Sequence, residues 1–284
     1  MKNNTVRHLW KQTIVLIILI SLAFPISTQG LFNDKVVWLI EVDEEGISAH
    51  GDTTAVATVF AGRGGSLGSP EVMQDLQSET FNETFSYSPI ADKHYYWIEN
   101  GITVGAGHAT TRVNSKALFI NRQWAWISRP SICTRFSLSM DAMGHSNLFG
   151  PFGSPAPGQT PMASGSCSAS TSSSINVPFQ VNNDYTWIHI NSTLFGKQDG
   201  QLGGEHMWGR WSIWQGATQL IYGIQTKNTQ DDENILVSAG NYELRCTYTS
   251  AYSSVPALTV FPEKVSHKHV TAGNEFTTNL EFYL

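Results

Sequence analysis

The residues of this chain best suited to ligand binding are tryptophans in its second half. Trp187 precedes a group of three, Trp208, Trp211 and Trp214, which follow one another at intervals of three residues. A flat indole face can stack on the apolar face of a sugar ring while its N–H donates a hydrogen bond. On a strand, Trp208 and Trp214 share one face, and Trp211 lies opposite unless a bulge intervenes. Filling of a sandwich core is the favoured interpretation of such large rings, and carbohydrate binding at these tryptophans is the alternative on which the candidate site rests.

Histidines and carboxylates form two short groups with metal-ligand chemistry. His267 and His269 share a strand face at a spacing that allows one metal ion to bind both, whereas His206 points the other way. Zinc needs three or four protein ligands. The acidic run at residues 231–234 lacks the alternate spacing and the glycine of a calcium loop. We therefore expect no metal site and no cofactor, and place these residues in solvated loops and turns.

The sequence predicts no catalytic residue. The run Gly144-His145-Ser146-Asn147-Leu148 approaches a nucleophile elbow, but Leu148 replaces the second glycine and no helical segment follows. We therefore expect Ser146 to be an exposed loop residue. A glycosidase needs two carboxylates at a spatial separation that one sequence does not reveal. The question of catalysis therefore stays open: we favour a non-catalytic protein and keep an extracellular hydrolase on a β scaffold as an alternative.

The chain has three cysteines, Cys133, Cys167 and Cys246, and no CxxC motif. An oxidising compartment permits at most one disulfide, in any of three pairings. The expected state is buried or partly paired cysteines, with no thiolate metal site.

Alternating, β-branched runs with turns between them predict an all-β fold. Asn100-Gly101 is the strongest hairpin signal, because both residues tolerate the positive φ of a type I′ turn. Ser69-Pro70-Glu71 is typical of a helix start and predicts one short helix near residues 70–77, buried through Val72, Met73 and Leu76. The expected architecture is an antiparallel, jelly-roll-like β-sandwich. Strands are expected over residues 36–42, 53–60, 80–87, 94–99, 102–113, 117–127, 132–140, 185–190, 207–214, 218–225, 235–238, 242–249, 257–261 and 275–284.

A tract rich in Gly, Pro, Ser and Thr, residues 150–174, interrupts this pattern. It predicts either a linker between sandwiches at 31–149 and 175–284 or a loop followed by a closely packed strand from about Ser164 to Val181. We favour the strand within one domain at 31–284, because a flexible linker has no structural need for a cysteine such as Cys167. Pro178 should place that strand at a sheet edge or bulge.

The N-terminus predicts export. Lys2, Arg7 and Lys11 precede an apolar run at 13–24, as in a signal peptide over residues 1–30. Its removal would change the net charge from −6 to −9, a balance that disfavours nucleic acid as a partner. We expect no stable transmembrane helix after signal removal and a secreted, extracellular or periplasmic location.

The second half resembles the layout of many secreted bacterial β-sandwich proteins of unknown function. The likeness rests on a Ser/Ala strand ending in Phe179-x-Val181, then Tyr185-Thr186, a glycine-rich hairpin region, the run from Ala239 to Leu244 and a final alternating strand. It covers roughly residues 164–284 and implies a jelly-roll-like sandwich and export, but no activity.

These observations favour a secreted module that binds carbohydrate or another cell-surface polymer, or that is structural. An outer-membrane β-barrel is an alternative, because Phe276, Leu280, Phe282 and Leu284 lie at alternating positions as in a barrel-closing strand. Self-assembly is a further alternative, in which the strand at residues 36–42 completes a neighbour's sheet edge.

Overall fold

The computed structural model describes residues 39–63, 66–67, 71–81, 85–99, 102–122, 130–147, 161–199, 202–254, 257–260 and 266–284. They belong to one compact unit, Leu39–Leu284. The predicted signal segment and residues 150–160 of the Gly/Pro/Ser/Thr tract lie outside the described residues. Two antiparallel sheets pack against each other, so the predicted all-β sandwich is confirmed, while its jelly-roll connectivity stays a prediction.

The first sheet, called sheet A, has six positions across its width. Its strands are β1 (Ile40–Val42), β2 (Ser48–Arg63), β3 (Ser66–Leu67), β4 (Glu71–Phe81), β9 (Pro161–Val181), β11 (Leu202–Gln215), β12 (Thr218–Thr226), β14 (Gly240–Ser254) and β15 (Ala257–Val260). The order is β12-β11-β14-β9-β2-β3, with β4 also paired to β2. Both β1 and β15 pair with β9, which therefore has neighbours along both sides.

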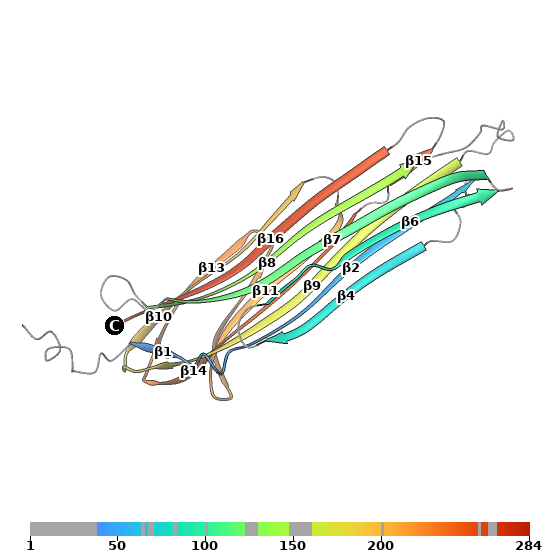
Figure 1. Cartoon of the computed structure of the whole chain (residues 1–284). Helices are drawn as coiled ribbons and strands as arrows, with labels where there is room; N and C mark the ends of the chain where they lie inside the picture. Colours follow the sequence, from blue (N-terminus) through green and yellow to red (C-terminus); the bar gives the residue numbers. More distant parts are fainter. Residues whose placement is uncertain are drawn as a thin grey trace, which may run out of the picture. The chain divides into compact units, whose positions relative to one another are not determined.

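The second sheet, called sheet B, lies against the first. Its strands are β5 (Phe85–Tyr87), β6 (Ile90–Glu99), β7 (Ile102–Arg122), β8 (Ser131–Asn147), β10 (Thr186–Asp199), β13 (Thr229–Val237) and β16 (Ser266–Tyr283). The order is β13-β10-β16-β8-β7-β5, with β6 also paired to β7. The long strands β16, β8 and β7 run side by side (Figure 1). Two strands predicted separately, at 102–113 and 117–127, belong to the single strand β7 as far as Arg122, and residues 123–127 lie outside the described residues.

Strand β9 confirms the predicted strand through the Ser/Ala run. Of the two positions predicted from Pro178, a sheet edge or a bulge, the edge is wrong. The strand pairs with β2 on one side and β14 on the other, so it is central in sheet A. Pro178 is accommodated because the neighbouring chain is interrupted there, between β1 and β2. The Pro178 carbonyl accepts a hydrogen bond from the Asp43 N–H, in the turn that joins these strands. The missing proline N–H thus faces a turn rather than a continuous ladder.

The packing between the sheets changes across their width. Small buried residues such as Ala55, Ala57 and Ala169 line the contact of β2 and β9 with β7. There the sheets approach closely enough for the Thr111 hydroxyl on β7 to donate to the Val56 carbonyl on β2, at 3.0 Å. Large aromatic rings separate the sheets farther along, where Phe136 stacks on Tyr248. This packed interior leaves the outer faces of both sheets to carry ligand-binding groups.

The predicted helix near residues 70–77 is wrong. Residues 71–81 form strand β4, which pairs with β2 from Val59–Glu71 to Ala49–Phe81. A helix-start pattern is a weak local signal that tertiary pairing overrides. Here the edge of β2 provides hydrogen-bonding partners along the whole of β4. Met73 and Leu76, expected to be buried by the helix, are 40% and 59% exposed.

Within the described residues, no helix is long and apolar enough to span a membrane.

Candidate functional site

The structure separates the four tryptophans that the sequence singles out. Trp211 is fully buried between the sheets, with Ile213 and Met207 on the same inward face of β11. The prediction that Trp211 contacts a ligand is therefore wrong, because its ring is part of the core. Trp208 and Trp214 share the outer face of sheet A, as their even spacing requires, and both are half-buried.

Trp214 is engaged within the protein. Its indole N–H donates to the Ser212 hydroxyl at 2.9 Å. The Arg245 guanidinium lies 4.4 Å from the centre of its ring, a cation–π contact. Glu243 holds that guanidinium in place through hydrogen bonds of 2.6 and 2.9 Å. One face of this indole is therefore covered by Arg245.

Trp187 lies elsewhere, on the outer face of sheet B, and is 38% exposed. Residues of β10 alternate, so that Thr186, Ile188 and Ile190 are buried and Trp187 points outward. Its direct cross-strand partners are Leu236 on β13 and Tyr283 on β16. Directly opposed side chains lie about 5 Å apart. The three side chains therefore form a continuous apolar row across three strands, called here the Trp187 row.

Polar side chains lie beside this row. His189, the next outward residue on β10, hydrogen bonds through Nε2 to Asp232 Oδ1 at 2.7 Å. The Glu281 carboxylate lies 3.9 Å from the His189 Nδ1. Tyr283 donates its hydroxyl to the Asn234 side-chain oxygen at 3.1 Å. An apolar platform with carboxylate, amide and hydroxyl groups at its border is the composition of a site for a polar ring with one apolar face.

The turn before β10 adds an exposed aromatic ring. Tyr185 is 76% exposed and has a φ of 61°, a left-handed conformation that is uncommon for a bulky residue. The turn is anchored by Asp184, whose Oδ1 accepts the Ala239 N–H at 2.9 Å, and by Thr186, whose hydroxyl donates to the Asn183 carbonyl at 2.8 Å. Residues held in such conformations cost roughly 1–3 kcal/mol each and cluster at ligand sites.

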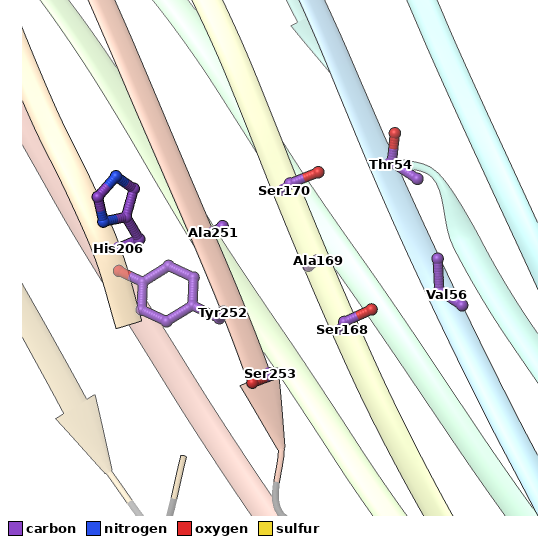
Figure 2. A pocket seen from close by; sticks show the side chains of 9 residues that line it. All are labelled: Thr54, Val56, Ser168, Ala169, Ser170, His206, Ala251, Tyr252 and Ser253. Carbon is purple, nitrogen blue, oxygen red and sulfur yellow. The ribbon is translucent and has the colours of Figure 1, made fainter. Parts of the chain in front are cut away.

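The outer face of sheet A carries a hollow of about 340 Å³. It lies over β9 and β14, where Ser168, Ser170 and Ala251 are too small to fill the surface, with His206 of β11 on one side and Val56 of β2 on the other (Figure 2). Its volume is near the lower end of the range for small-molecule sites. The exposed indole of Trp187 lies on the other sheet.

The remaining residues weighed from the sequence are dispersed. Asp232 contacts His189, whereas the Asp231 carboxylate accepts a hydrogen bond from buried Gln225 at 3.1 Å. His267 and His269 belong to β16 rather than to a loop. Asn147 and the residues before it, back to Gly144, belong to β8 rather than to an exposed loop.

All three cysteines are thiols, and the structure contains no disulfide between them. Cys246 lies opposite Ile175 in β9, eight residues along that strand from Cys167. Eight strand residues span about 26 Å, far beyond disulfide reach. Cys133 alternates with buried Ile132 and Thr134, so it points away from the interior that holds Cys246.

Sequence reasoning missed Tyr283 and Leu236 as neighbours of Trp187. The alternation in β10 does place Tyr185, Trp187 and His189 on one side of the strand. The partners of Trp187 are Leu236 on β13 and Tyr283 on β16, which follow it in the chain by 49 and 96 residues. Single-strand periodicity carries no information about such pairings.

Comparisons with known proteins assign no family. No protein-family model matches the chain, and no curated protein matches it. One solved structure that it resembles is TmCBM61 in complex with β-1,4-galactotriose, at 7% identity and a TM-score of 0.19, covering 34% of this chain and 71% of that one. Another is the GH31 α-xylosidase Xac1773 from Xanthomonas citri, at 4% identity and a TM-score of 0.18, covering 66% of this chain and 32% of that one. Likenesses at these TM-scores carry no argument about the fold or the function of this chain.

Proposed function

We propose that this chain is an exported, non-catalytic β-sandwich module that binds a polysaccharide or another extracellular polymer at the Trp187 row. The observation that carries the proposal is the exposed indole of Trp187, set between Leu236 and Tyr283 at directly paired positions. An open platform on a sheet face suits a polymer, because a chain can enter and leave at both ends of the row. Two polar groups beside it, Asp232 and Asn234, can accept hydrogen bonds from sugar hydroxyls.

Trp187→Ala is the decisive variant. The purified protein is mixed with a panel of insoluble polysaccharides, and the depleted fraction is measured from tryptophan fluorescence of the supernatant. Loss of a central aromatic contact costs roughly 2 kcal/mol or more, about thirtyfold in Kd. Trp187→Ala should therefore abolish retention on the polymer that binds the wild-type protein.

Phe195→Ala is the matched control. Phe195 lies on the same strand and the same outer face, is 62% exposed, and is eight residues from Trp187, about 26 Å. Its removal should leave retention unchanged, and circular dichroism should show both variants folded. Equal retention of wild type and Trp187→Ala would reject the Trp187 row as the binding surface.

Export is tested separately. Expression in a bacterial host followed by N-terminal sequencing of the exported product should identify a chain beginning near Leu31, after the predicted signal segment. Retention of the protein in the cytoplasm with an intact Met1 would contradict this part of the proposal.

A hydrolase is the second candidate function, favoured by one observation. Asp232 and Glu281 approach the same imidazole, that of His189, beside the Trp187 row. Paired carboxylates are the machinery of most glycosidases. Incubation of the retained polymer with the protein, with assay of released reducing ends, separates the two functions. Release that is lost in Glu281→Gln would establish the hydrolase and overturn the non-catalytic assignment.

A further inference from the structure

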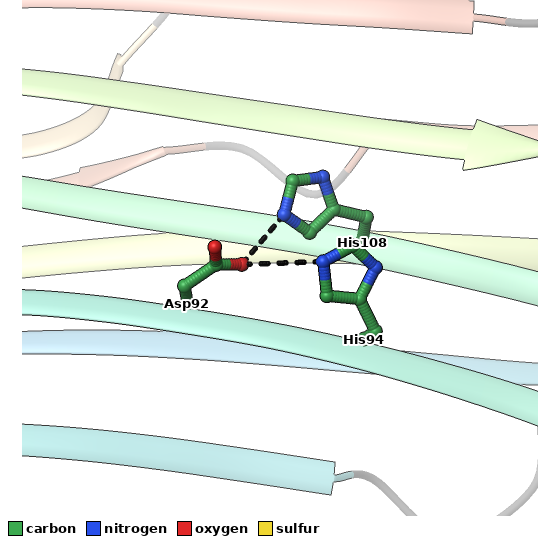
Figure 3. A group of neighbouring side chains, drawn as sticks. All are labelled: Asp92, His94 and His108. Carbon is green, nitrogen blue, oxygen red and sulfur yellow. Dashed lines mark hydrogen bonds and ion pairs between the residues drawn. The ribbon is translucent and has the colours of Figure 1, made fainter.

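Two neighbouring strands of sheet B bring together three side chains that the sequence does not group. Asp92 and His94 lie on the outer face of β6, and His108 lies directly opposite His94 on β7 (Figure 3). One ligand atom from each of the three residues lies within 4.8 Å of the others. These residues are far from Trp187 in strand order, because β8 and β16 lie between β7 and β10.

The geometry of the cluster converges on one carboxylate oxygen. Asp92 Oδ1 lies 2.6 Å from the His108 Nε2 and 3.6 Å from the His94 Nε2. The two imidazole rings are stacked, with centroids 3.9 Å apart and planes 12° from parallel. Each ring therefore points its Nε2 toward the Asp92 Oδ1. The side chains are accessible to an ion from solvent, with 49% of Asp92, 53% of His94 and 25% of His108 exposed.

Surrounding groups orient the cluster. The Thr110 hydroxyl lies 3.2 Å from Asp92 Oδ1 and 2.9 Å from the His108 Nε2. The backbone N–H of Asp92 donates to the Met73 sulfur of β4, on the other sheet. Burial raises the pKa of Asp92, but the hydrogen bond and charge of His108, with smaller contributions from Thr110 and His94, outweigh it and lower the pKa overall. The carboxylate is therefore anionic at neutral pH.

A β-bulge creates this arrangement. Trp97 pairs with Gly105 and Ile98 with Thr103, so β7 carries one extra residue between the two pairs. If that residue were paired instead of bulged, continuation of the Glu99–Ile102 pairing would set His108 opposite Lys93 instead of His94. A shift of one residue moves a side chain to the other face of a sheet. The bulge thus brings the second imidazole to the face that carries Asp92.

We propose that Asp92, His94 and His108 bind a divalent transition-metal ion, for which Zn²⁺ is the probe of choice. Two imidazoles and one carboxylate are a donor set of zinc sites that keep a fourth position open. Zinc–ligand bonds of 2.0–2.1 Å in a tetrahedron set the ligand atoms about 3.3 Å apart. The distances between Asp92 and the two histidines bracket this value, so small side-chain rotations admit the ion.

The backbone register extends the row of histidines. His145 on β8 pairs with His108, and His267 on β16 pairs with His145. Four adjacent strands thus carry histidine at one backbone register position. One member of the imidazole pair considered from the sequence, His267, belongs to this row. The proposed ligands occupy the end of the row where Asp92 supplies the negative charge.

Zinc binding to the full-length protein tests the proposal. Competition with a chromophoric chelator should give one Zn²⁺ per chain, and His94→Ala, His108→Ala and Asp92→Asn should each weaken binding at least about tenfold, because even supporting groups around a metal ligand contribute that much. His50→Ala is the matched control: His50 also contacts a carboxylate, Asp52, at 3.1 Å on an outer face, but no second imidazole of the described residues joins them in such a cluster. Its affinity should equal that of the wild type.

Imidazole NMR signals identify the ligands directly. Added Zn²⁺ should shift the ring-nitrogen signals of His94 and His108 and leave those of His50 and His189 in place. Unchanged signals for His94 and His108, or wild-type affinity in both alanine variants, would overturn the proposal. Such a result includes the case in which His145 and His267 bind the ion without them. Retention of the protein on polymer does not enter this test, so failure of one proposal leaves the other standing.

Discussion

Burial decides the chemistry of individual cysteines in this protein. Cys246 is fully buried, and burial raises the pKa of its thiol to about 11, against a smaller opposing effect of the hydrogen bond from Thr134. Because the thiolate is the reactive form, Cys246 should not react with a disulfide reagent at pH 8 until the protein unfolds, whereas half-buried Cys133 should react first. Mass spectrometry of labelled peptides checks the order. Fewer than three thiols after denaturation without reductant would reveal a disulfide and contradict the structure.

The Asp92 carboxylate should titrate below its ordinary range. Its pKa is lowered from 3.8 in the folded protein, despite the opposing effect of burial, because His108 bonds to the charged form. A depressed folded pKa means that the stabilising contribution is complete above pH 3.8 and is lost as the pH falls through the folded pKa. The side chain is 49% exposed, so this contribution should be under about 1 kcal/mol. Carboxyl ¹³C NMR should show a higher pKa in His108→Ala; an equal or lower pKa there would show that His108 is not the cause.

Strand β11 passes so close to sheet B that one position requires glycine. A Cβ placed on Gly209 would overlap the ring of Phe276, which is itself fully buried. Gly209→Ala should therefore lower the free energy of unfolding by about 1–3 kcal/mol, the usual cost of overpacking. Gly273→Ala is the control, because its Cβ would make only an ordinary contact, 3.5 Å from the Leu138 carbonyl oxygen. Urea denaturation compares the two variants. Equal stabilities would show that β11 and sheet B move apart to accommodate the added methyl group.

A substitution in β4 distinguishes the observed strand from the helix that its sequence predicts, because the two differ in the burial of Leu76. Leu76 faces solvent on the strand, whereas the predicted helix would bury it. Leu76→Ala should therefore change the free energy of unfolding by less than about 0.5 kcal/mol. Leu244→Ala, at a fully buried position, should cost about 2–5 kcal/mol. A large loss at Leu76, measured by thermal or urea unfolding, would favour a buried segment at this edge.

The two halves of the chain share both sheets, so the molecule should unfold as one unit. In sheet A, β9 lies between β2 and β14, and in sheet B, β8 lies between β7 and β16. Neither half can keep its sheets intact after the other unfolds. Urea transitions followed by tryptophan fluorescence and by far-ultraviolet circular dichroism should therefore coincide. Two separated transitions would instead support independent sandwiches at 31–149 and 175–284.

The sequence by itself determined the features that depend on local periodicity. Alternation along single runs indicated antiparallel strands, Asn100-Gly101 indicated the β6–β7 hairpin that the Glu99–Ile102 pairing confirms, and even spacing placed Trp208 and Trp214 on one face. These features follow from interactions between residues near in sequence, for which the side-chain period of two is sufficient information.

Only the tertiary structure decided which strands meet and in which register. It paired residues 71–81 with β2 as a strand in place of the predicted helix and buried Trp211. It also set Tyr283 and Leu236 beside Trp187, and brought His108 to the face of His94 through the bulge in β7. Each outcome depends on pairing between distant segments, where a shift of one residue exchanges the inner and outer faces. Local patterns do not contain that register, because the packing of both sheets selects it.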